Sequence, residues 1–112
     1  MSKLRTLKTQ KSRFKNKKHL AWVRSLGCAV QCHECNGVIQ AHHLLKPWSG
    51  ERGMGMKSND RNAIPLCFRH HHLLHTKFGD ELKFFEHYTG KADYGKALAE
   101  ALWDQSEWST KE

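Results

Sequence analysis

Two chelating pairs of cysteine and histidine, far apart along the chain, constrain this sequence more than any other feature. The first pair is Cys32 and Cys35, and the second is Cys67 and His70. Each pair leaves two residues between its members, a spacing that lets both side chains reach one tetrahedral ion. A shell of three sulfurs and one nitrogen suits zinc. We therefore predict a structural Zn²⁺ that clamps a short knuckle, residues 28–37, onto the segment after Cys67.

Two further points bear on this prediction. Cys28 is the remaining thiol; it could substitute for Cys32, but we expect it to be a buried apolar filler. The alternative for the whole set is that these side chains are small core residues without a metal, and the paired spacing on both sides favours zinc. Cysteines in C-x-x-C spacing without a secretion signal also favour reduced thiols, and hence a cytoplasmic location.

The size of the chain supports the need for such a staple. At 112 residues, with 38% hydrophobic residues, the sequence predicts one small domain with a modest core. Domains of this size often need a metal or a disulfide for stability. No run of about 18 apolar residues is present, so we expect no membrane partner. The basic N-terminus lacks the apolar segment of a secretory signal.

The net charge of +8 is confined to one end of the chain. The first 18 residues contain no acidic residue and 8 of the 19 basic ones, whereas the other 11 basic residues are balanced by 11 acidic ones. We expect residues 1–17 to be a disordered, flexible basic arm that contacts nucleic acid. The alternative is a solubilising tail. The basic residues are Lys3, Arg5, Lys8, Lys11, Arg13, Lys15, Lys17 and Lys18.

Hydrophobic periodicity and helix-breaking residues predict an α+β fold in which 18–112 form one domain. Gly79 is expected to end one helix, and Asp80 to cap the next. Three glycines make 47–60 a long loop. The expected elements are a helix at 18–26, strands at 38–45 and 63–67, and helices at 68–78, 81–88 and 92–103. The last two helices lie within a C-terminal part, 80–106, which we expect to pack behind the functional site.

A second group of histidines suggests chemistry as well as structure. His71 and His75 are four residues apart, so on a helix they share one face and can bind one cation. His42 and His43 are neighbours on a predicted strand and point to opposite faces. One of them can bind the metal while the other addresses a water molecule. Hydrolysis needs this division between a Lewis acid and a separate base.

The order of these residues resembles the HNH, or ββα-metal, endonuclease family. The resemblance covers about 32–78, and the string from Gly53 to His75 looks especially like short HNH proteins of phages and prophages, including relatives of the phage recombination-enhancement nuclease. It implies a small ββα-metal core with a structural zinc knuckle. The residues that carry it are Ala41-His42-His43, Asn62-Ala63-Ile64-Pro65-Leu66-Cys67, His70-His71 and His75.

The resemblance also implies a role for each residue of the motif. His43 would be the general base that activates water, with His42, His71 and His75 as ligands of the catalytic cation. Asn62 would constrain the hairpin and help orient the base. His72 remains a rival to His71, since it is three residues before His75. The zinc knuckle would use Cys32, Cys35, Cys67 and His70, the last in a place often taken by cysteine.

The predicted function is therefore metal-dependent hydrolysis of DNA phosphodiester bonds, in phage or prophage DNA metabolism or recombination within a bacterial host cell. The catalytic divalent cation is expected to be Mg²⁺, Mn²⁺, Ni²⁺ or Zn²⁺, and three imidazoles favour the last three. The partner is DNA; the sequence does not indicate the oligomeric state. The candidate DNA-contacting residues are Arg52, Lys57, Arg61 and Arg69 near the site, and Lys15, Lys17 and Lys18 at the basic end.

Two other classes of function fit parts of the pattern. A non-catalytic, zinc-stabilised DNA-binding protein would need the staple but not the second histidine set. A metal-buffering protein would bind several ions and have no affinity for DNA. The second histidine set favours the nuclease, because neither a binding module nor its staple requires a base placed beside a separate cation.

Overall fold

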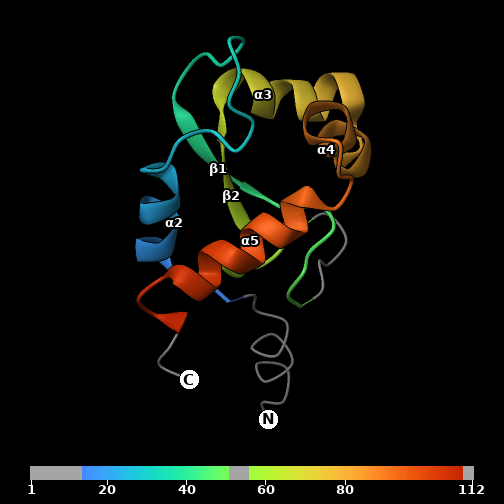
Figure 1. Ribbon diagram of the computed structural model, residues 1–112. Coiled ribbons are helices and arrows are strands. Elements are labelled where there is room, and N and C mark those ends of the chain that lie inside the picture. The colour runs from blue at the N-terminus through green and yellow to red at the C-terminus, as the bar shows by residue number, and fades with distance from the viewer. Residues whose placement is uncertain (1–13, 51–55, 110–112) are drawn as a thin grey trace.

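The structure is a computed structural model that describes residues 14–50 and 56–109 (Figure 1). Its fold is small and α+β, as predicted. The described part has one antiparallel two-stranded sheet, in which Ile39 pairs with Cys67 and His43 pairs with Ala63. The elements are α2 (Lys17–Arg24), β1 (Ile39–His43), a 3₁₀ turn (Asp60–Asn62), β2 (Ala63–Cys67), α3 (Phe68–Leu73), α4 (Glu81–Thr89) and α5 (Tyr94–Gln105).

The helix after β2 continues beyond α3 as a π-helical stretch, Leu74–Phe78. It ends at Gly79, whose φ of 62° lies in the left-handed region that glycine adopts without strain. The side chain of Asp80 then accepts a hydrogen bond from the Leu82 N–H at 2.9 Å and caps α4. The predicted stop at Gly79 and the predicted cap at Asp80 are both confirmed.

The predicted bounds of the other elements differ modestly from those observed. The strand β2 has the predicted range, but β1 is shorter than predicted: Val38, expected to begin it, is 72% exposed. The first helix ends at Arg24 instead of residue 26, and α5 runs two residues later than predicted at both ends. These shifts leave the assignment of each element unchanged.

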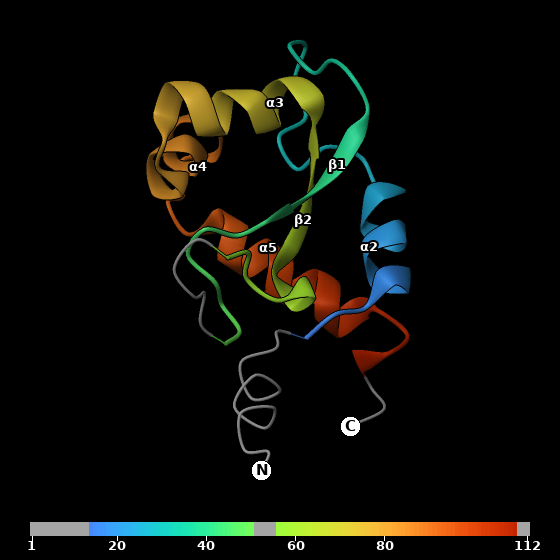
Figure 2. The ribbon, with the colours of Figure 1, turned by 180° about the vertical axis from the view of Figure 1, so that it is seen from behind.

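The sheet is covered on one face by α5, with α2 against its side, as the two opposite views show (Figures 1 and 2). All five residues of β2 are buried, including Pro65, whose carbonyl accepts a hydrogen bond from the Ala29 N–H at 2.8 Å. A strand buried on both faces has a continuous apolar sequence, which matches its composition. The hairpin is therefore held at the centre of the molecule.

The hydrophobic core lies between the sheet, the helix after it, and α4. The largest fully buried apolar side chains include Phe84 and Phe85 of α4. Phe84 stacks edge-on against Phe78, with ring centroids 5.5 Å apart, and so joins α4 to the end of the preceding helix. The rest of the core comes mainly from Leu44, Ile64, Leu66 and Leu74.

The end of the predicted basic arm is part of the folded unit. The Phe14 ring contacts the Trp103 ring at 5.5 Å, its carbonyl accepts a hydrogen bond from the Asp60 N–H at 3.0 Å, and Asn16 caps α2. For residues 14–17 the expectation of a flexible arm is wrong, because Phe14 packs against an aromatic side chain of α5. Residues 1–13 of the arm lie outside the described residues. Within the described part, no helix is long and apolar enough to cross a membrane.

Candidate metal centres and candidate active site

All four cysteines of the chain are free thiols that converge on the His70 ring at the junction of β2 and α3. The sulfurs of Cys28 and Cys35 lie 3.7 Å from His70 Nδ1, and that of Cys67 lies 3.2 Å from it. The sulfur of Cys32 lies 3.5 Å from the other ring nitrogen, Nε2. Three thiols therefore face one nitrogen, and the fourth faces the opposite one.

These separations fit a zinc shell at Nδ1. With a Zn–S bond of about 2.3 Å and a Zn–N bond of about 2.05 Å, tetrahedral ligands lie about 3.6 Å apart. The three sulfurs at Nδ1 are 3.2 to 3.7 Å from it. One imidazole cannot bind the same ion through both nitrogens, so Cys32 is excluded from that shell.

The group whose ligand atoms all lie within 4.8 Å of one another is Cys28, Cys35, Cys67 and His70. A Cys₃His cluster that could hold a metal such as zinc is thus present, with one correction to its membership. Cys28 takes the place predicted for Cys32; it is buried, as expected, but its sulfur is among the ligands. Cys32 instead groups with Glu34 on the other side of His70.

The protonation of this cluster follows from its burial. Burial raises the pKa of the Cys28 thiol to about 12. For Cys67, burial alone would raise the pKa of the thiol. The N–H groups of His70 and Asn36 point at its sulfur, however, and the net result is a pKa below the ordinary value. Burial lowers the pKa of His70, which keeps its imidazole neutral and able to bind a metal.

A second group joins His42 of β1 to His71 and His75 of the helix after β2. One nitrogen from each of the three imidazoles lies within 4.8 Å of the others. Their ring centroids are 4.9 to 5.4 Å apart. His72 is exposed, stacks on Phe68 and is not in this group, so the geometry favours His71 over its rival. The structure thus brings together the three histidines predicted to share one ion.

Polar side chains of Glu81 and Gln40 orient two of these rings. His42 Nε2 donates a hydrogen bond to the Glu81 carboxylate at 2.7 Å, so Nδ1 is the nitrogen that can face a cation. His71 Nδ1 donates to the Gln40 side-chain oxygen, which leaves Nε2 as its ligand atom. Glu81, 3% exposed, also accepts the N–H groups of Leu45 and Lys46. Partners of this kind fix the tautomer of a metal-binding histidine.

Burial favours the neutral form of two of these imidazoles, His71 and His75. Burial, together with the smaller effects of the neighbouring imidazoles of His42, His75 and His43, lowers the pKa of His71 to about 4. Burial and His42 also lower the pKa of His75, against a smaller opposite effect of Glu81. Imidazoles that resist protonation near neutral pH are competent ligands for a divalent cation.

The predicted base, His43, lines the same cleft as the histidine group. The cleft has a volume of about 430 Å³. The side chain of His43 is 8% exposed, and its Nε2 donates a hydrogen bond to Asp60 Oδ1 at 2.8 Å. His42 and His43 thus have different hydrogen-bond partners, because side chains alternate along β1, but both line the same cleft. The residues around it are Ala41, His42, His43, Leu45, Met56, Lys57, His71 and His75.

Asn62 is fully buried and holds the loop that leaves β1. Its side-chain oxygen accepts the N–H groups of Trp48 at 2.7 Å and Ser49 at 3.2 Å, and its amide donates to the Ser49 carbonyl at 3.0 Å. These bonds support the predicted role of constraining the hairpin. The neighbouring Trp48 also donates its ring N–H to the Arg61 carbonyl.

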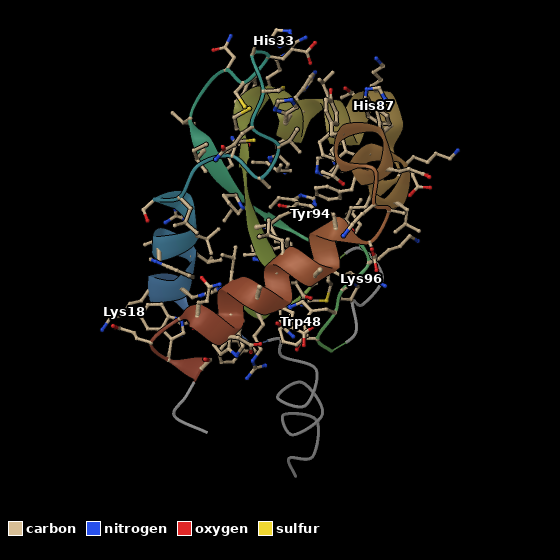
Figure 3. The ribbon with its side chains drawn as sticks, in the orientation of Figure 1. Lys18, His33, Trp48, His87, Tyr94 and Lys96 are labelled. Atoms are coloured by element: carbon tan, nitrogen blue, oxygen red, sulfur yellow. The ribbon has the colours of Figure 1, made fainter. Side chains whose placement is uncertain are left out.

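The predicted DNA-contacting residues lie in different places. Lys57 is exposed and lines the cleft. The Arg61 guanidinium instead lies 3.9 Å from the Phe14 ring and 5.2 Å from that of Trp103, where it packs against α5. Arg69 is exposed beside the cysteine cluster, and Arg52 lies outside the described residues. Lys15, Lys17 and Lys18 are exposed at the start of α2, and Lys18 projects outward in Figure 3.

Sequence reasoning missed Glu81, Asp60 and Gln40, the polar side chains that bind the histidines. Glu81 is 39 residues from its partner His42, and Asp60 is 17 residues from His43. Both carboxylates are buried, at 3% and 2% exposure. No spacing rule links positions so far apart, although an acidic residue at the first turn of a predicted helix, as at Glu81, is common for local reasons.

Comparisons with known proteins place the chain in a family but do not assign an activity. Residues 3–102 match the family model described as protein of unknown function DUF968. The chain belongs to this family. It is also 32% identical over 92 residues to the uncharacterized protein YdfU of Escherichia coli (strain K12), which covers 74% of this chain. The chain spans about a quarter (24%) of the length of that relative. No solved structure shows significant similarity to the chain.

Proposed function

We propose that this chain is a metal-dependent endonuclease of the HNH, or ββα-metal, type that hydrolyses phosphodiester bonds in DNA. The observation that carries the proposal is the convergence of three metal-competent imidazoles, His42, His71 and His75, with a fourth, His43, on one cleft. The cleft lies where an antiparallel hairpin meets the following helix. The Cys₃His cluster joins the segment before β1 to the junction of β2 and α3. A binding module that needs only a staple would have no use for the second group.

The residues divide the proposed reaction between them. His43 takes a proton from a water molecule, whose oxygen then forms a bond to phosphorus as the bond from phosphorus to the 3′-oxygen breaks. The products are a 5′-phosphate and a 3′-hydroxyl, the latter taking its proton from solvent. A divalent cation held by His42, His71 and His75 would supply Lewis-acid stabilisation of the negative charge on the phosphate. Mn²⁺, Ni²⁺ and Zn²⁺ suit three imidazoles better than Mg²⁺.

The placement of Lys57 supports an anionic substrate. Its side chain lines the cleft beside the histidines, where an ammonium group can bind a phosphate oxygen. The eight basic residues among the first 18 add a sequence-independent attraction to a polyanion. We propose weak sequence preference and, from the resemblance to phage and prophage HNH proteins, a role in phage or prophage DNA metabolism.

The test is nicking of supercoiled plasmid in the presence of Mg²⁺, Mn²⁺, Ni²⁺ or Zn²⁺. His43→Ala should keep its zinc content and DNA binding but cut about 10²–10⁴-fold more slowly, because only the base is lost. The matched control is His87→Ala, which removes an exposed histidine of α4 that does not line the cleft. It should cut at the wild-type rate.

Two outcomes would contradict the proposal. Cleavage by His43→Ala at the wild-type rate would remove His43 from the reaction. Absence of nicking by the wild-type chain with every one of these cations, together with retained DNA binding, would favour the non-catalytic, zinc-stabilised DNA-binding protein.

A further inference from the structure

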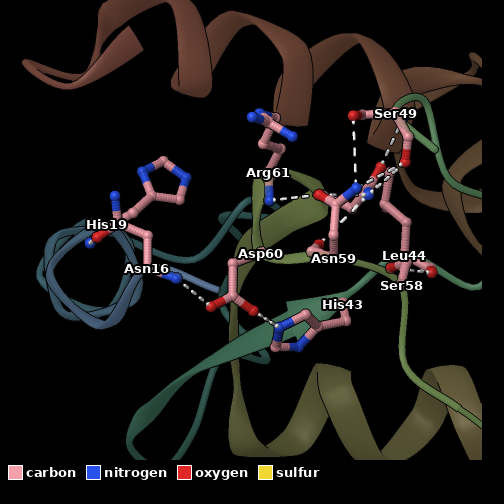
Figure 4. Close-up of polar contacts among 10 residues, drawn as sticks. Asn16, His19, His43, Leu44, Ser49, Ser58, Asn59, Asp60 and Arg61 are labelled. Carbon is pink, nitrogen blue, oxygen red and sulfur yellow. Dashed lines mark hydrogen bonds and ion pairs between the residues drawn. The ribbon is translucent and has the colours of Figure 1, made fainter. Parts of the chain in front are cut away.

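Asp60 is a buried carboxylate with bonds to both of its oxygens. Its side chain is 3% exposed, although an ionised carboxylate is unfavourable in the interior unless it is well bonded. Oδ1 accepts the His43 Nε2–H at 2.8 Å, and Oδ2 accepts the Asn16 N–H at 2.7 Å (Figure 4). The same residue also donates its own N–H to the Phe14 carbonyl at 3.0 Å. Asp60 thus ties the segment before α2 to the imidazole of His43.

We propose that Asp60 is a positioning residue that fixes the ring orientation and the tautomer of His43. This inference rests on the proposed role of His43 as the base. A carboxylate can only accept, so a neutral His43 must carry its proton on Nε2 to bond with Oδ1. The lone pair is then on Nδ1, the nitrogen that would have to take the proton from water. Loss of the carboxylate would remove the acceptor that requires this tautomer and this ring orientation.

Asp60 can fix the ring of His43 because Asp60 is itself held in place. Its backbone N–H bonds to Phe14, its Oδ2 bonds to Asn16, and it begins the 3₁₀ turn Asp60–Asn62 that leads directly into β2. Residue 60 is therefore held from two directions, by the segment before α2 and by the hairpin. An acceptor fixed in this way holds the imidazole in one orientation, as the partner of a hydrolytic histidine must.

The variant Asp60→Asn separates orientation from simple packing. An amide has the same shape but only one oxygen, which can face either the Asn16 N–H or His43. The Asn16 backbone N–H can only donate a hydrogen bond. The His43 imidazole can instead move its proton to the other ring nitrogen and accept. The amide oxygen should therefore turn to Asn16, with its NH₂ donating to His43 Nε2 and the ring proton moving to Nδ1. Such a tautomer cannot act as the base from Nδ1.

The primary measurement is the ¹⁵N NMR spectrum of the His43 ring at about pH 8, where an ordinary imidazole is neutral. The zinc-loaded wild-type chain should show protonated Nε2 and unprotonated Nδ1, and Asp60→Asn should show the reverse or a mixture. In plasmid nicking, Asp60→Asn should lower kcat about 10²–10⁴-fold with little change in KM, because substrate binding is unaffected. Asp93→Asn, an exposed acidic residue before α5 whose side chain makes no capping bond, should match the wild type in both assays.

The results separate this inference from the proposed function. The tautomer of wild-type His43 requires neither a variant nor activity, so it tests the inference even if Asp60→Asn does not fold. Protonated Nδ1 in the wild-type chain overturns it. So does a loss of cleavage in Asp60→Asn without any change of tautomer, which would mean a structural role. A change of tautomer without loss of cleavage would remove His43 from the reaction and so overturn the proposed function. A wild-type chain that shows the expected tautomer but cuts no DNA overturns the proposed function instead.

Discussion

At the scale of single residues, the orientation of one imidazole decides which thiols can share a metal. His70 presents Nδ1 to Cys28, Cys35 and Cys67, and presents Nε2 to Cys32. The C-x-x-C spacing favoured Cys32 because two ligands separated by two residues are common in zinc sites. In the folded chain Cys28 is also bonded, since its sulfur accepts the Cys67 N–H at 3.3 Å. The thiol outside the motif therefore lies nearer the centre of the cluster.

This difference predicts unequal effects of two serine substitutions. Cys28→Ser should weaken zinc binding by at least about 100-fold, because a hydroxyl is a poor ligand for zinc, whereas Cys32→Ser should have a much smaller effect. Competition with a chromogenic chelator measures both affinities on the purified chain. A greater loss for Cys32→Ser would return Cys32 to the shell and remove Cys28 from it.

Glu81 is predicted to tune the affinity of the histidine group. Glu81→Gln replaces the carboxylate that binds His42 Nε2 but keeps an oxygen for the Leu45 or Lys46 N–H. We expect Mn²⁺ affinity of the zinc-loaded chain to fall about 10- to 100-fold, because the imidazole loses its charged partner. Titration calorimetry measures it. Glu86→Gln, an exposed change on the same helix, is the control and should leave the affinity unchanged; equal affinities in all three proteins would contradict a role for Glu81.

At the scale of elements, the knuckle must approach the start of α3 closely. Two backbone bonds join them, from the Phe68 N–H to the Val38 carbonyl at 2.8 Å and from the Arg69 N–H to the Asn36 carbonyl at 3.0 Å. Gly37 lies between these acceptors with a φ of 88°. A Cβ at Gly37 would lie 2.5 Å from the Cβ of Phe68. Glycine at this position therefore permits the junction that brings Cys35 and Cys67 together.

Gly37→Ala should destabilise the chain by about 2–4 kcal/mol, from the left-handed backbone and the clash together. The matched control is Gly90→Ala, because Gly90 has a φ of 82° but no atom within 4 Å of an added Cβ. It should lose only the backbone part, about 1–2 kcal/mol. Urea unfolding of the zinc-loaded proteins measures the difference. Equal losses in the two variants would mean that the close approach to Phe68 is not important.

At the scale of the whole molecule, two metal-competent groups share the helix that follows β2. The Cys₃His cluster includes His70, and the histidine group includes the next residue, His71, together with His75 one turn further on. The strands β1 and β2 form the hairpin, and its buried strand β2 packs against α5 (Figure 2). A change at the cluster should therefore affect stability, and a change at the histidine group should affect chemistry.

Removal of zinc tests directly whether the Cys₃His cluster contributes to stability. Chelation should lower the free energy of unfolding by at least about 3 kcal/mol, because binding energy at a structural zinc site contributes to folding. For about 100 residues this corresponds to an unfolding midpoint lower by at least about 12 °C, which added zinc should restore. Thermal melting followed by circular dichroism measures it. His75→Ala should melt like the wild type in zinc, and an unchanged melting curve after complete zinc removal would contradict a structural role for the ion.

Much of the local structure could be predicted from the sequence. The range of β2, the helix that ends at Gly79 and the Asp80 cap depend on side-chain patterns and backbone preferences over a few residues. The grouping of His71 with His75 depends on helix geometry alone. Their grouping with His42 was expected from a family resemblance, and the antiparallel register of the hairpin provides it.

The sequence by itself determined which residues could bind a metal, because ligand chemistry and spacing along one element are local properties. The tertiary structure alone decided which partners those residues have. It placed Cys28 instead of Cys32 at His70 Nδ1, Glu81 at His42 and Asp60 at His43. The physical reason is that a hydrogen bond depends on the rotation of a ring and on segments tens of residues apart, and neither is encoded in spacing.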